Sequence, residues 1–323
     1  MKKNLKAIPK VLLIILIVII GLVVTVIGGL NLAKFAIYYN YYSIESSVCK
    51  NPGLSDGFVC QGIAFADENN KFLVSGYMKD NSNSRIYVTD EDNNSYYVLL
   101  TKDGKSFTGH VGGIATTYEY VYLANDNKIY TIELEKILSS SEGDSIDVGD
   151  GIEVNNQASF VYTDEKHLYV GEFHNGNKYV TDHPYETKEG MHYAIVTKYN
   201  LSDLTKPLMV YSIRDKVQGI CFTPDGKVIM STSYGLTNTV YYVYDENLAT
   251  KSEYTLDGAD VYYLEDCIYK FNGPAMGEDL DFYNGKIITL TESASDKYLF
   301  GKLFFANKIV SLDYKKKLEK IEE

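Results

Sequence analysis

Short runs of apolar residues separated by polar turns recur along most of this 323-residue chain. The stretch VQGICFTPDGKVIMSTS, residues 217–233, shows the unit: an apolar run, a Pro-Asp-Gly turn and a second apolar run. Runs of about four to eight β-branched and aromatic residues bounded by Gly, Pro, Asn and Asp are typical of strands joined by tight turns. The chain also contains 30 Tyr, which favours half-buried strand faces. The pattern therefore predicts a mostly β protein.

The unit occurs five times. Its copies begin at Cys60, Val111, Asn156, Val217 and Gly277. The aligned first positions are Gln61, Gly112, Gln157, Gln218 and Glu278. A period near 50 residues with about four strands each is typical of a β-propeller, because sheets stacked around an axis bury faces that none could bury alone. We therefore expect an all-β fold with a five-bladed propeller over residues 57–314. Six blades are the alternative, since residues 253–266 also look like strands.

One segment near the N-terminus has a different character. Residues 11–33, VLLIILIVIIGLVVTVIGGLNLA, carry no charge and are long enough to span the roughly 30 Å hydrocarbon core as a helix. Lys2, Lys3, Lys6 and Lys10 precede this segment without any acidic residue, which favours a cytoplasmic tail over residues 1–10. We expect a retained signal anchor in a single-pass protein of the cell membrane, with the bulk of the chain extracellular. A cleaved signal peptide is the alternative, although its apolar region is usually only about 7–15 residues long.

Two further segments flank the propeller, and the net charge of the chain restricts its partners. Residues 34–56 are expected to form a linker with a ring-closing strand, and residues 315–323 a charged C-terminal tail. Residues 1–35 hold five Lys and no acidic residue, so the formal charge of −12 for the whole chain becomes about −17 for the rest. Nucleic acid phosphates and anionic lipid headgroups repel such a body. We therefore expect no nucleic-acid partner, and a body that either uses its charge for solubility or handles cations.

All four cysteines follow the apolar segment. In an extracellular domain they are expected to pair, and the favoured bridges are Cys49–Cys60 and Cys221–Cys267. A buried thiol in an apolar strand is the alternative for Cys221. The absence of a Cys-x-x-Cys spacing argues against a zinc site.

The repeat unit QGICFTPDGKVIMSTS resembles the inner strand, turn and second strand of the broad β-propeller superfamily that includes gluconolactonase-like, NHL and lactonase-type proteins. The resemblance covers residues 57–314 and implies an architecture without implying an activity, because propellers host many functions. Gluconolactonase-like proteins place an acidic residue in a comparable Glu-Gly dipeptide. Here the dipeptide is Gln-Gly at 61–62 and 218–219 and Glu-Asp at 278–279, which weakens the case for a catalytic metal.

The first strand of each propeller blade lines the central channel, so the aligned positions are candidates for a binding site. The candidates are Gln61, Gln157, Gln218 and Glu278, together with the neighbouring Asp279. Their amide and carboxylate oxygens suit calcium or a polar small molecule, with Glu278 and Asp279 as the metal ligands. The alternative is that these side chains only form hydrogen bonds between blades.

Two histidines are further candidates near the blade ends. His110 and His174 could act as ligands or general bases, or could simply be solvated loop residues. The polar insertion of residues 174–193 is either a recognition loop or a mobile surface loop.

The sequence contains no G-x-S-x-G, H-E-x-x-H or Walker motif. We therefore favour a membrane-anchored extracellular propeller that binds a small molecule or an extracellular protein. The alternatives are a metal-dependent hydrolase of the lactonase or phosphodiesterase type, with its site at the channel, and a structural envelope protein.

Overall fold

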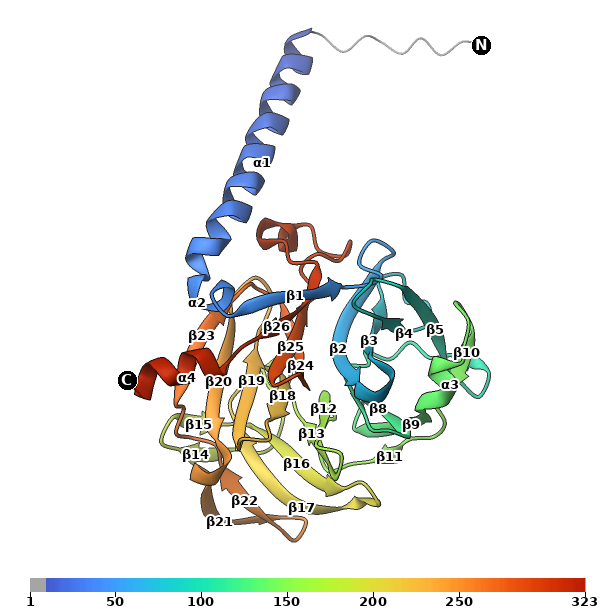
Figure 1. Ribbon diagram of the computed structural model, residues 1–323, viewed down its shortest axis with the longest axis vertical. Helices are drawn as coiled ribbons and strands as arrows, with labels where there is room; N and C mark the ends of the chain where they lie inside the picture. The colour runs from blue at the N-terminus through green and yellow to red at the C-terminus, as the bar shows by residue number, and fades with distance from the viewer. Residues whose placement is uncertain (1–9, 323) are drawn as a thin grey trace.

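A computed structural model describes residues 10–322 and shows a five-bladed β-propeller, which confirms the expected fold class (Figure 1). Residues 1–9 of the cytoplasmic tail predicted for residues 1–10, with Lys2, Lys3 and Lys6, lie outside the described residues. Each blade starts with one copy of the repeat unit, because the two apolar runs of each copy form its two innermost antiparallel strands.

The first two blades cover residues 58–153. The strands of blade 1 are β2 (Phe58–Ala66), β3 (Lys71–Met78), β4 (Arg85–Thr89) and β5 (Ser95–Lys102), with β6 (Lys105–Ser106) and β10 (Ser145–Asp147) beside β5. The strands of blade 2 are β7 (Gly113–Thr116), β8 (Tyr120–Asn125), β9 (Lys128–Glu133) and β11 (Ile152–Glu153). The short helices of this region are η1 (Asp67–Asn69) and α3 (Leu134–Leu138).

The other three blades complete the ring. The strands of blade 3 are β12 (Phe160–Thr163), β13 (His167–Gly171), β16 (Ala194–Asn200) and β17 (Asp203–Ile213). The strands of blade 4 are β18 (Val217–Phe222), β19 (Lys227–Thr232), β20 (Thr239–Asp245) and β23 (Tyr269–Gly273). The strands of blade 5 are β24 (Gly277–Tyr283), β25 (Lys286–Thr291), β26 (Lys308–Leu312) and β1 (Glu45–Lys50).

The ring closes through the strand that follows the apolar helix. Strand β1 pairs antiparallel with β26, with Glu45 opposite Leu312 and Lys50 opposite Lys308. The N-terminal segment thereby supplies the outermost strand of the last blade. Joining the two ends of the propeller in one sheet ties the ring together without any covalent link.

The strand-like residues 253–266 do not form a sixth blade. They contribute to β21 (Thr250–Leu256) and β22 (Ala259–Tyr263), and β22 pairs in parallel with the outer strand β17 of blade 3. Blade 3 also carries a separate hairpin, β14 (Tyr185–Thr187) and β15 (Gly190–His192).

The apolar core lies between neighbouring sheets, and inner strands such as β2 and β19 are buried along almost their whole length because both faces of their sheets are covered. Separate clusters fill the spaces between blades 5 and 1, blades 1 and 2, and blades 2 and 3, and the largest cluster joins blades 3, 4 and 5. Hydroxyl groups on the second strands add hydrogen bonds to the next blade: Ser75 Oγ donates to Val111 O at 3.1 Å, and Ser231 Oγ donates to Glu278 O.

Helix α1 (Lys10–Ile37) is long and apolar enough to cross a membrane, and its side chains make few contacts with the propeller. Figure 1 shows α1 joining the rim of the disc through the short helix α2 (Tyr39–Tyr42), close to the loop that contains η3 (Phe300–Phe304). At the other end of the chain, the expected charged tail forms helix α4 (Lys315–Glu322).

The structure differs from the expected cysteine pairing, because all four thiols are free. Cys60 Sγ instead contacts Asn51 Nδ2 at 3.1 Å, and Cys221 is buried in an apolar strand. Cys267 Sγ donates to the Tyr269 carbonyl oxygen at 3.2 Å. Packing and local hydrogen bonds therefore accommodate the sulfur atoms that the predicted bridges would have joined.

Candidate functional site

The innermost strands approach one another very closely where they begin. The second position of each repeat copy is small in four of the five blades: Gly62, Gly113, Ala158 and Gly219. A Cβ atom at Gly113 would lie 2.5 Å from Val161 N in the next blade, and one at Gly62 would lie 2.7 Å from Ile114 N. At Gly62 and Gly113 a side chain would collide with the backbone of the next blade, so glycine is required at these two positions.

The fifth blade places Asp279 at this same position. Its carboxylate accepts hydrogen bonds from Ile63 N at 3.3 Å and from Leu280 N at 2.9 Å, and the Ile114 amide also donates to it. The space left by Gly219 accommodates it, since a Cβ there would lie 2.4 Å from Asp279 Oδ1. Asp279 is fully buried, and as an acceptor it joins the three inner strands β2, β7 and β24 at the axis.

The first-position residues do not converge on one shared ligand site. Gln61 Nε2 donates to Glu292 Oε2 at 3.0 Å, and Gln218 Nε2 donates to Ser233 Oγ at 3.4 Å. Gln157 is exposed, and its Nε2 donates to Val180 O at 2.8 Å. Each amide serves its own blade or a neighbouring loop.

Glu278 is buried close to Glu292, a carboxylate that the sequence analysis did not select. Burial raises the pKa of Glu278 well above its usual range, and the charges of Glu292 and Asp279 raise it further. Burial also raises the pKa of Glu292 to about 7, although hydrogen bonds from Tyr298 and Gln61 lower it. Glu278 therefore favours the neutral acid, and Glu292 changes its charge close to neutral pH.

The proposed metal ligands are therefore not arranged as a metal site. Within residues 10–322, no group of three or more His, Cys, Asp or Glu side chains is placed to hold a metal ion. Asp279 uses its oxygens on backbone amides, and Glu278 favours its protonated form. The calcium site expected from the sequence therefore stays a prediction, and the arrangement of these two carboxylates does not support it.

The candidate histidines belong to two separate surroundings. His110 is exposed, and its ring stacks on Tyr77 with centroids 4.5 Å apart. His174 is buried, and its Nδ1 accepts a hydrogen bond from the Thr181 amide at 3.3 Å. The structure does not bring the two histidines into one site.

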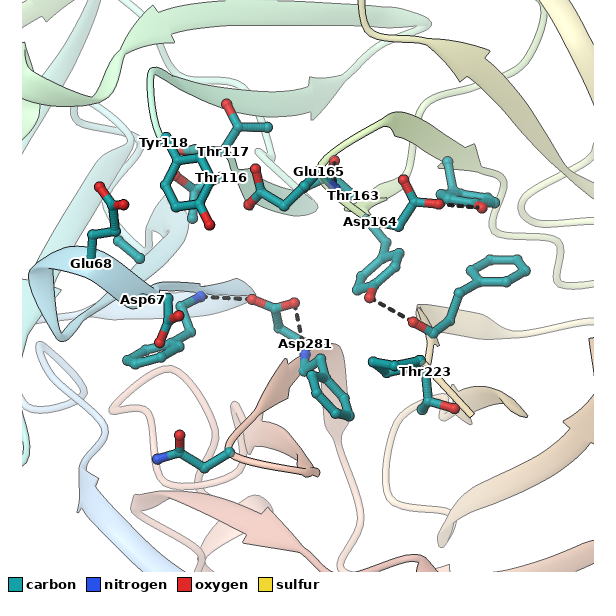
Figure 2. A pocket seen from close by; sticks show the side chains of 18 of the residues that line it. Asp67, Glu68, Thr116, Thr117, Tyr118, Thr163, Asp164, Glu165, Thr223 and Asp281 are labelled. Carbon is teal, nitrogen blue, oxygen red and sulfur yellow. Dashed lines mark hydrogen bonds between the residues drawn. The ribbon is translucent and has the colours of Figure 1, made fainter. Parts of the chain in front are cut away.

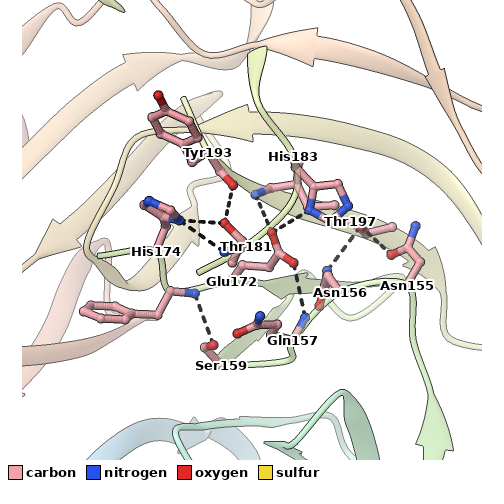
Figure 3. A network of polar contacts seen from close by, with 12 residues as sticks. Asn155, Asn156, Gln157, Ser159, Glu172, His174, Thr181, His183, Tyr193 and Thr197 are labelled. Carbon is pink, nitrogen blue, oxygen red and sulfur yellow. Dashed lines mark hydrogen bonds and ion pairs between the residues drawn. The ribbon is translucent and has the colours of Figure 1, made fainter. Parts of the chain in front are cut away.

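The polar insertion of residues 174–193 is held by a buried network (Figure 3). Glu172 lies at its centre and receives hydrogen bonds from Gln157 N and Ile195 N, and its Oε2 lies 2.9 Å from His183 Nδ1. Burial opposes the protonation of His183, but the hydrogen bond and ion pair with Glu172 outweigh it and raise the pKa of His183. The network attaches the insertion to blade 3.

A cavity of about 600 Å³ opens at the other end of the axis, where the innermost strands end (Figure 2). All five blades contribute the turn between their first two strands. The lining turns are 65–69, 116–118, 162–165, 222–224 and 281–285. We call this space the acidic cavity, because its charged side chains are Asp67, Glu68, Asp164, Glu165, Glu246 and Asp281, and no Lys, Arg or His of the described chain lines it.

Local backbone structure positions the carboxylates around the cavity. Asp164 caps the turn after β12 by accepting from Lys166 N and His167 N, and this turn holds Glu165 in a left-handed conformation with φ of 68°. Asp67 and Glu68 lie on η1 in blade 1. Figure 2 shows Glu68, Glu165 and Asp281 on different sides of one open space.

These carboxylates repel one another. Burial raises the pKa of Glu165, and the charges of three neighbours raise it further: Asp164, Glu68 and Asp67. A site whose members are destabilised by uncompensated negative charge is stabilised by any cation that enters it.

Asp281 lies at the wall between blades 5 and 1. Its Oδ2 accepts from Phe65 N and its Oδ1 from Phe282 N, both at 2.7 Å. Burial nevertheless raises the pKa of Asp281 to about 7, and the charge of Glu165 adds to the shift. Asp281 therefore changes its charge close to neutral pH, and a cation in the cavity would favour its ionised form.

Aromatic and hydroxyl groups complete the lining. Tyr118, Tyr162 and Tyr169 contribute rings, and Tyr162 Oη donates to Phe222 O at 2.7 Å, which joins blades 3 and 4. Tyr169 Oη donates to Asp164 Oδ2 at 2.9 Å. Rings beside carboxylates suit a ligand that is both positively charged and partly apolar.

The candidate residues predicted from the repeat lie where the inner strands begin, whereas the cavity lies where they end. A usable signal was present in the aligned turns, ADEN at 66–69 and TDEK at 163–166, which place adjacent acidic residues at equivalent positions in two blades. Asp281 gave a weaker signal, because only its place at the end of β24 links it to these turns.

No protein-family model matches this chain, and no curated protein matches it. Solved structures resemble it in fold. The PQQ-bound aldose sugar dehydrogenase of Streptomyces coelicolor is 13% identical with a TM-score of 0.46, over 77% of each chain. The WD40 β-propeller domain of Doa1 is 12% identical with a TM-score of 0.42, over 76% of this chain and 79% of that one. Hydrazine synthase of Kuenenia stuttgartiensis is 10% identical with a TM-score of 0.39, and the match covers 72% of this chain but only 55% of that one.

Proposed function

We propose that this chain is a membrane-anchored binding module whose extracellular propeller binds a small organic cation in the acidic cavity. The observation that carries the proposal is the composition of the lining: six carboxylates from four blades surround a space of about 600 Å³, and no basic side chain of the described chain lines it. Only Asp164 has a basic neighbour behind the lining, because His167 Nδ1 lies 3.0 Å from its Oδ2. This volume lies within the range of about 300–1,000 Å³ that is typical of small-molecule sites.

The chemistry of the lining favours an amine over a bare metal ion. Metal ions need several carboxylates converging on one point, and no such group occurs within residues 10–322. Carboxylates spread around a wide cavity instead match a ligand with separated ammonium groups. The exposed ring of Tyr118 can cover its methylene groups and interact with its charge.

The anchor is proposed from α1. Its charge-free stretch follows a segment with four Lys and no acidic residue, which favours the N-terminus inside and the propeller outside. Figure 1 shows α1 joining the rim of the disc and extending away from it, so the helix covers neither face of the propeller. A ligand would reach the acidic cavity from a face of the disc, without passing between the propeller and the membrane.

A thermal unfolding experiment on the full-length, detergent-solubilised protein tests the proposal. A ligand that binds only the native state raises the melting temperature. Spermidine is the probe, and a neutral diol of similar length is the control ligand. We expect spermidine to raise the melting temperature and the diol to leave it unchanged.

Two variants separate the cavity from general surface charge. Asp281→Asn should reduce the spermidine shift, whereas Asp150→Asn should leave it intact, because the Asp150 side chain is 97% exposed and outside the cavity. Equal shifts in both variants would show that spermidine binds the acidic surface without using the cavity. The absence of any shift in the wild type would reject an amine ligand.

A further inference from the structure

The loop between β25 and β26 exposes large apolar side chains. Leu299 is 78% exposed, Phe300 is 64% exposed and Phe305 is 37% exposed. Leu299 and Phe300 are adjacent at the start of η3, where the folded body gives them little cover. Apolar groups gathered in this way mark an interaction surface.

The same loop is fixed to the last turns of α1. Asn31 forms two hydrogen bonds with it: Asn31 Nδ2 donates to Lys302 O at 3.1 Å, and Phe305 N donates to Asn31 Oδ1 at 3.0 Å. Lys34 Nζ also donates to Phe305 O at 2.5 Å. The rings of Tyr38 and Phe304 lie 5.9 Å apart in an edge-to-face arrangement. Figure 1 shows this loop beside the end of α1.

These contacts determine the depth of the loop if α1 spans a bilayer. The uncharged stretch of the helix ends at Lys34, whose ammonium group belongs at the headgroups. Asn31 precedes Lys34 by three residues, which at 1.5 Å per residue places it about 4.5 Å deeper. A loop bonded to both residues must lie at the membrane surface.

The composition of the loop suits that position. Aromatic and aliphatic side chains enter the boundary between headgroups and acyl chains, and neighbouring Lys side chains reach the phosphates. Lys302 pairs with Asp296 at 2.8 Å, and Lys297 lies over the ring of Tyr77. Both Lys flank the exposed pair Leu299 and Phe300.

We propose that residues 296–305 form a second membrane contact, in which Leu299 and Phe300 insert into the outer leaflet beside α1. The inference rests on the proposed membrane anchoring. Two contacts on one edge hold the propeller on its rim, and they keep the acidic cavity at a fixed height and direction above the bilayer. A single helix joined by a flexible linker would give no such orientation.

A single-tryptophan experiment tests this contact, because the chain contains no Trp. Phe300→Trp places one Trp in the loop. Tyr254→Trp is the matched control, since Tyr254 is 51% exposed and lies on β21 at the far side of the disc from α1 (Figure 1). Each full-length variant is reconstituted into phosphatidylcholine vesicles with or without bromine on the upper part of the acyl chains.

We expect brominated lipid to quench the Phe300→Trp emission at least twofold and to leave the Tyr254→Trp emission unchanged. Equal quenching of the two variants would overturn the second contact. Alkaline carbonate extraction of the same vesicles tests α1 separately. Protein that stays in the vesicles with an unquenched Trp rejects only the loop contact, and protein released by carbonate rejects the anchor on which the contact rests.

Discussion

The acidic residues at the two ends of the propeller axis differ in their surroundings and in their roles. Where the inner strands begin, Asp279 accepts hydrogen bonds from buried amides, and burial and neighbouring charges favour the protonated form of Glu278. Where the strands end, Glu68, Glu165 and Asp281 surround an open cavity that no described basic residue lines. The comparison shows that an acidic residue on the axis indicates a binding site only where the strands leave space for a ligand.

The spacing of the strands explains the difference. Glycines at the strand starts let the backbones of neighbouring blades meet, so the carboxylate of Asp279 replaces a ligand in the little space that remains. The turns at the strand ends instead line a cavity of about 600 Å³. Mutations where the strands begin are therefore expected to change stability, and mutations where the strands end are expected to change ligand binding.

The largest expected effect is on stability at the closed end. Asp279→Ala leaves the amides of Ile63 and Leu280 without their acceptor, and each unsatisfied buried donor costs about 1–3 kcal/mol. We expect the free energy of unfolding to fall by roughly 3 kcal/mol or more, measured by denaturant titration. Asp150→Ala is the control on the exposed surface and should change stability by less than about 0.5 kcal/mol. A fully stable Asp279→Ala variant would contradict the structural role.

The next largest effect concerns ligand affinity at the open end. Asp281→Asn removes the charge and keeps one of the two acceptor oxygens that the Phe65 and Phe282 amides use. We expect the affinity for spermidine at pH 8 to fall about tenfold, which corresponds to about 1.4 kcal/mol. Circular dichroism should show an unchanged fold. Unchanged affinity would mean that Asp281 does not face the ligand.

A pH series sharpens the same comparison. Burial raises the pKa of Asp281 to about 7, so ionisation between pH 6 and pH 8 should strengthen spermidine binding several-fold. Without ligand, the stability of the protein should depend on pH in the opposite direction and fall as the pH rises. A carboxyl whose pKa is raised on folding stabilises the protein fully at pH values below its unfolded pKa, and this stabilisation is lost as pH rises towards and through the folded pKa. Asp281→Asn should flatten both trends, and the same slopes in variant and wild type would assign them to another group.

The smallest effect is expected at an exposed first-position residue. Gln157→Ala removes one hydrogen bond to the Val180 carbonyl group at the surface. Stability should change by less than about 0.5 kcal/mol and spermidine affinity should not change. A marked loss of binding would restore the predicted ligand role of Gln157.

Much of the fold could be predicted from the repeat unit. Five copies, each with two apolar runs separated by a turn, specify five pairs of inner strands, because each apolar run must be buried against a neighbouring sheet. The outer strands were harder to assign. Strand β22 joins blade 3 through parallel pairing with β17, between residues such as Val210 and Val261 that lie far apart in the sequence.

The site was predicted less well than the fold. The sequence aligned Gln61, Gln218 and Glu278, but alignment does not say how tightly the strands meet at that level. The partner of Gln61 is Glu292, 231 residues away, and no local pattern links the two. The acidic turns after β2 and β12 lay within the aligned copies, yet only the ring geometry shows that they face one cavity.

A calorimetric titration of three full-length proteins with spermidine at pH 8 tests the central claim most directly. The proteins are the wild type, Asp281→Asn at the open end and Glu278→Gln at the closed end. Glu278 favours the neutral acid, so Gln is a close substitute for it in size and charge. We expect the wild type and Glu278→Gln to bind alike and Asp281→Asn to bind about tenfold more weakly. Loss of binding in Glu278→Gln with full binding in Asp281→Asn would place the ligand at the strand starts and contradict this account.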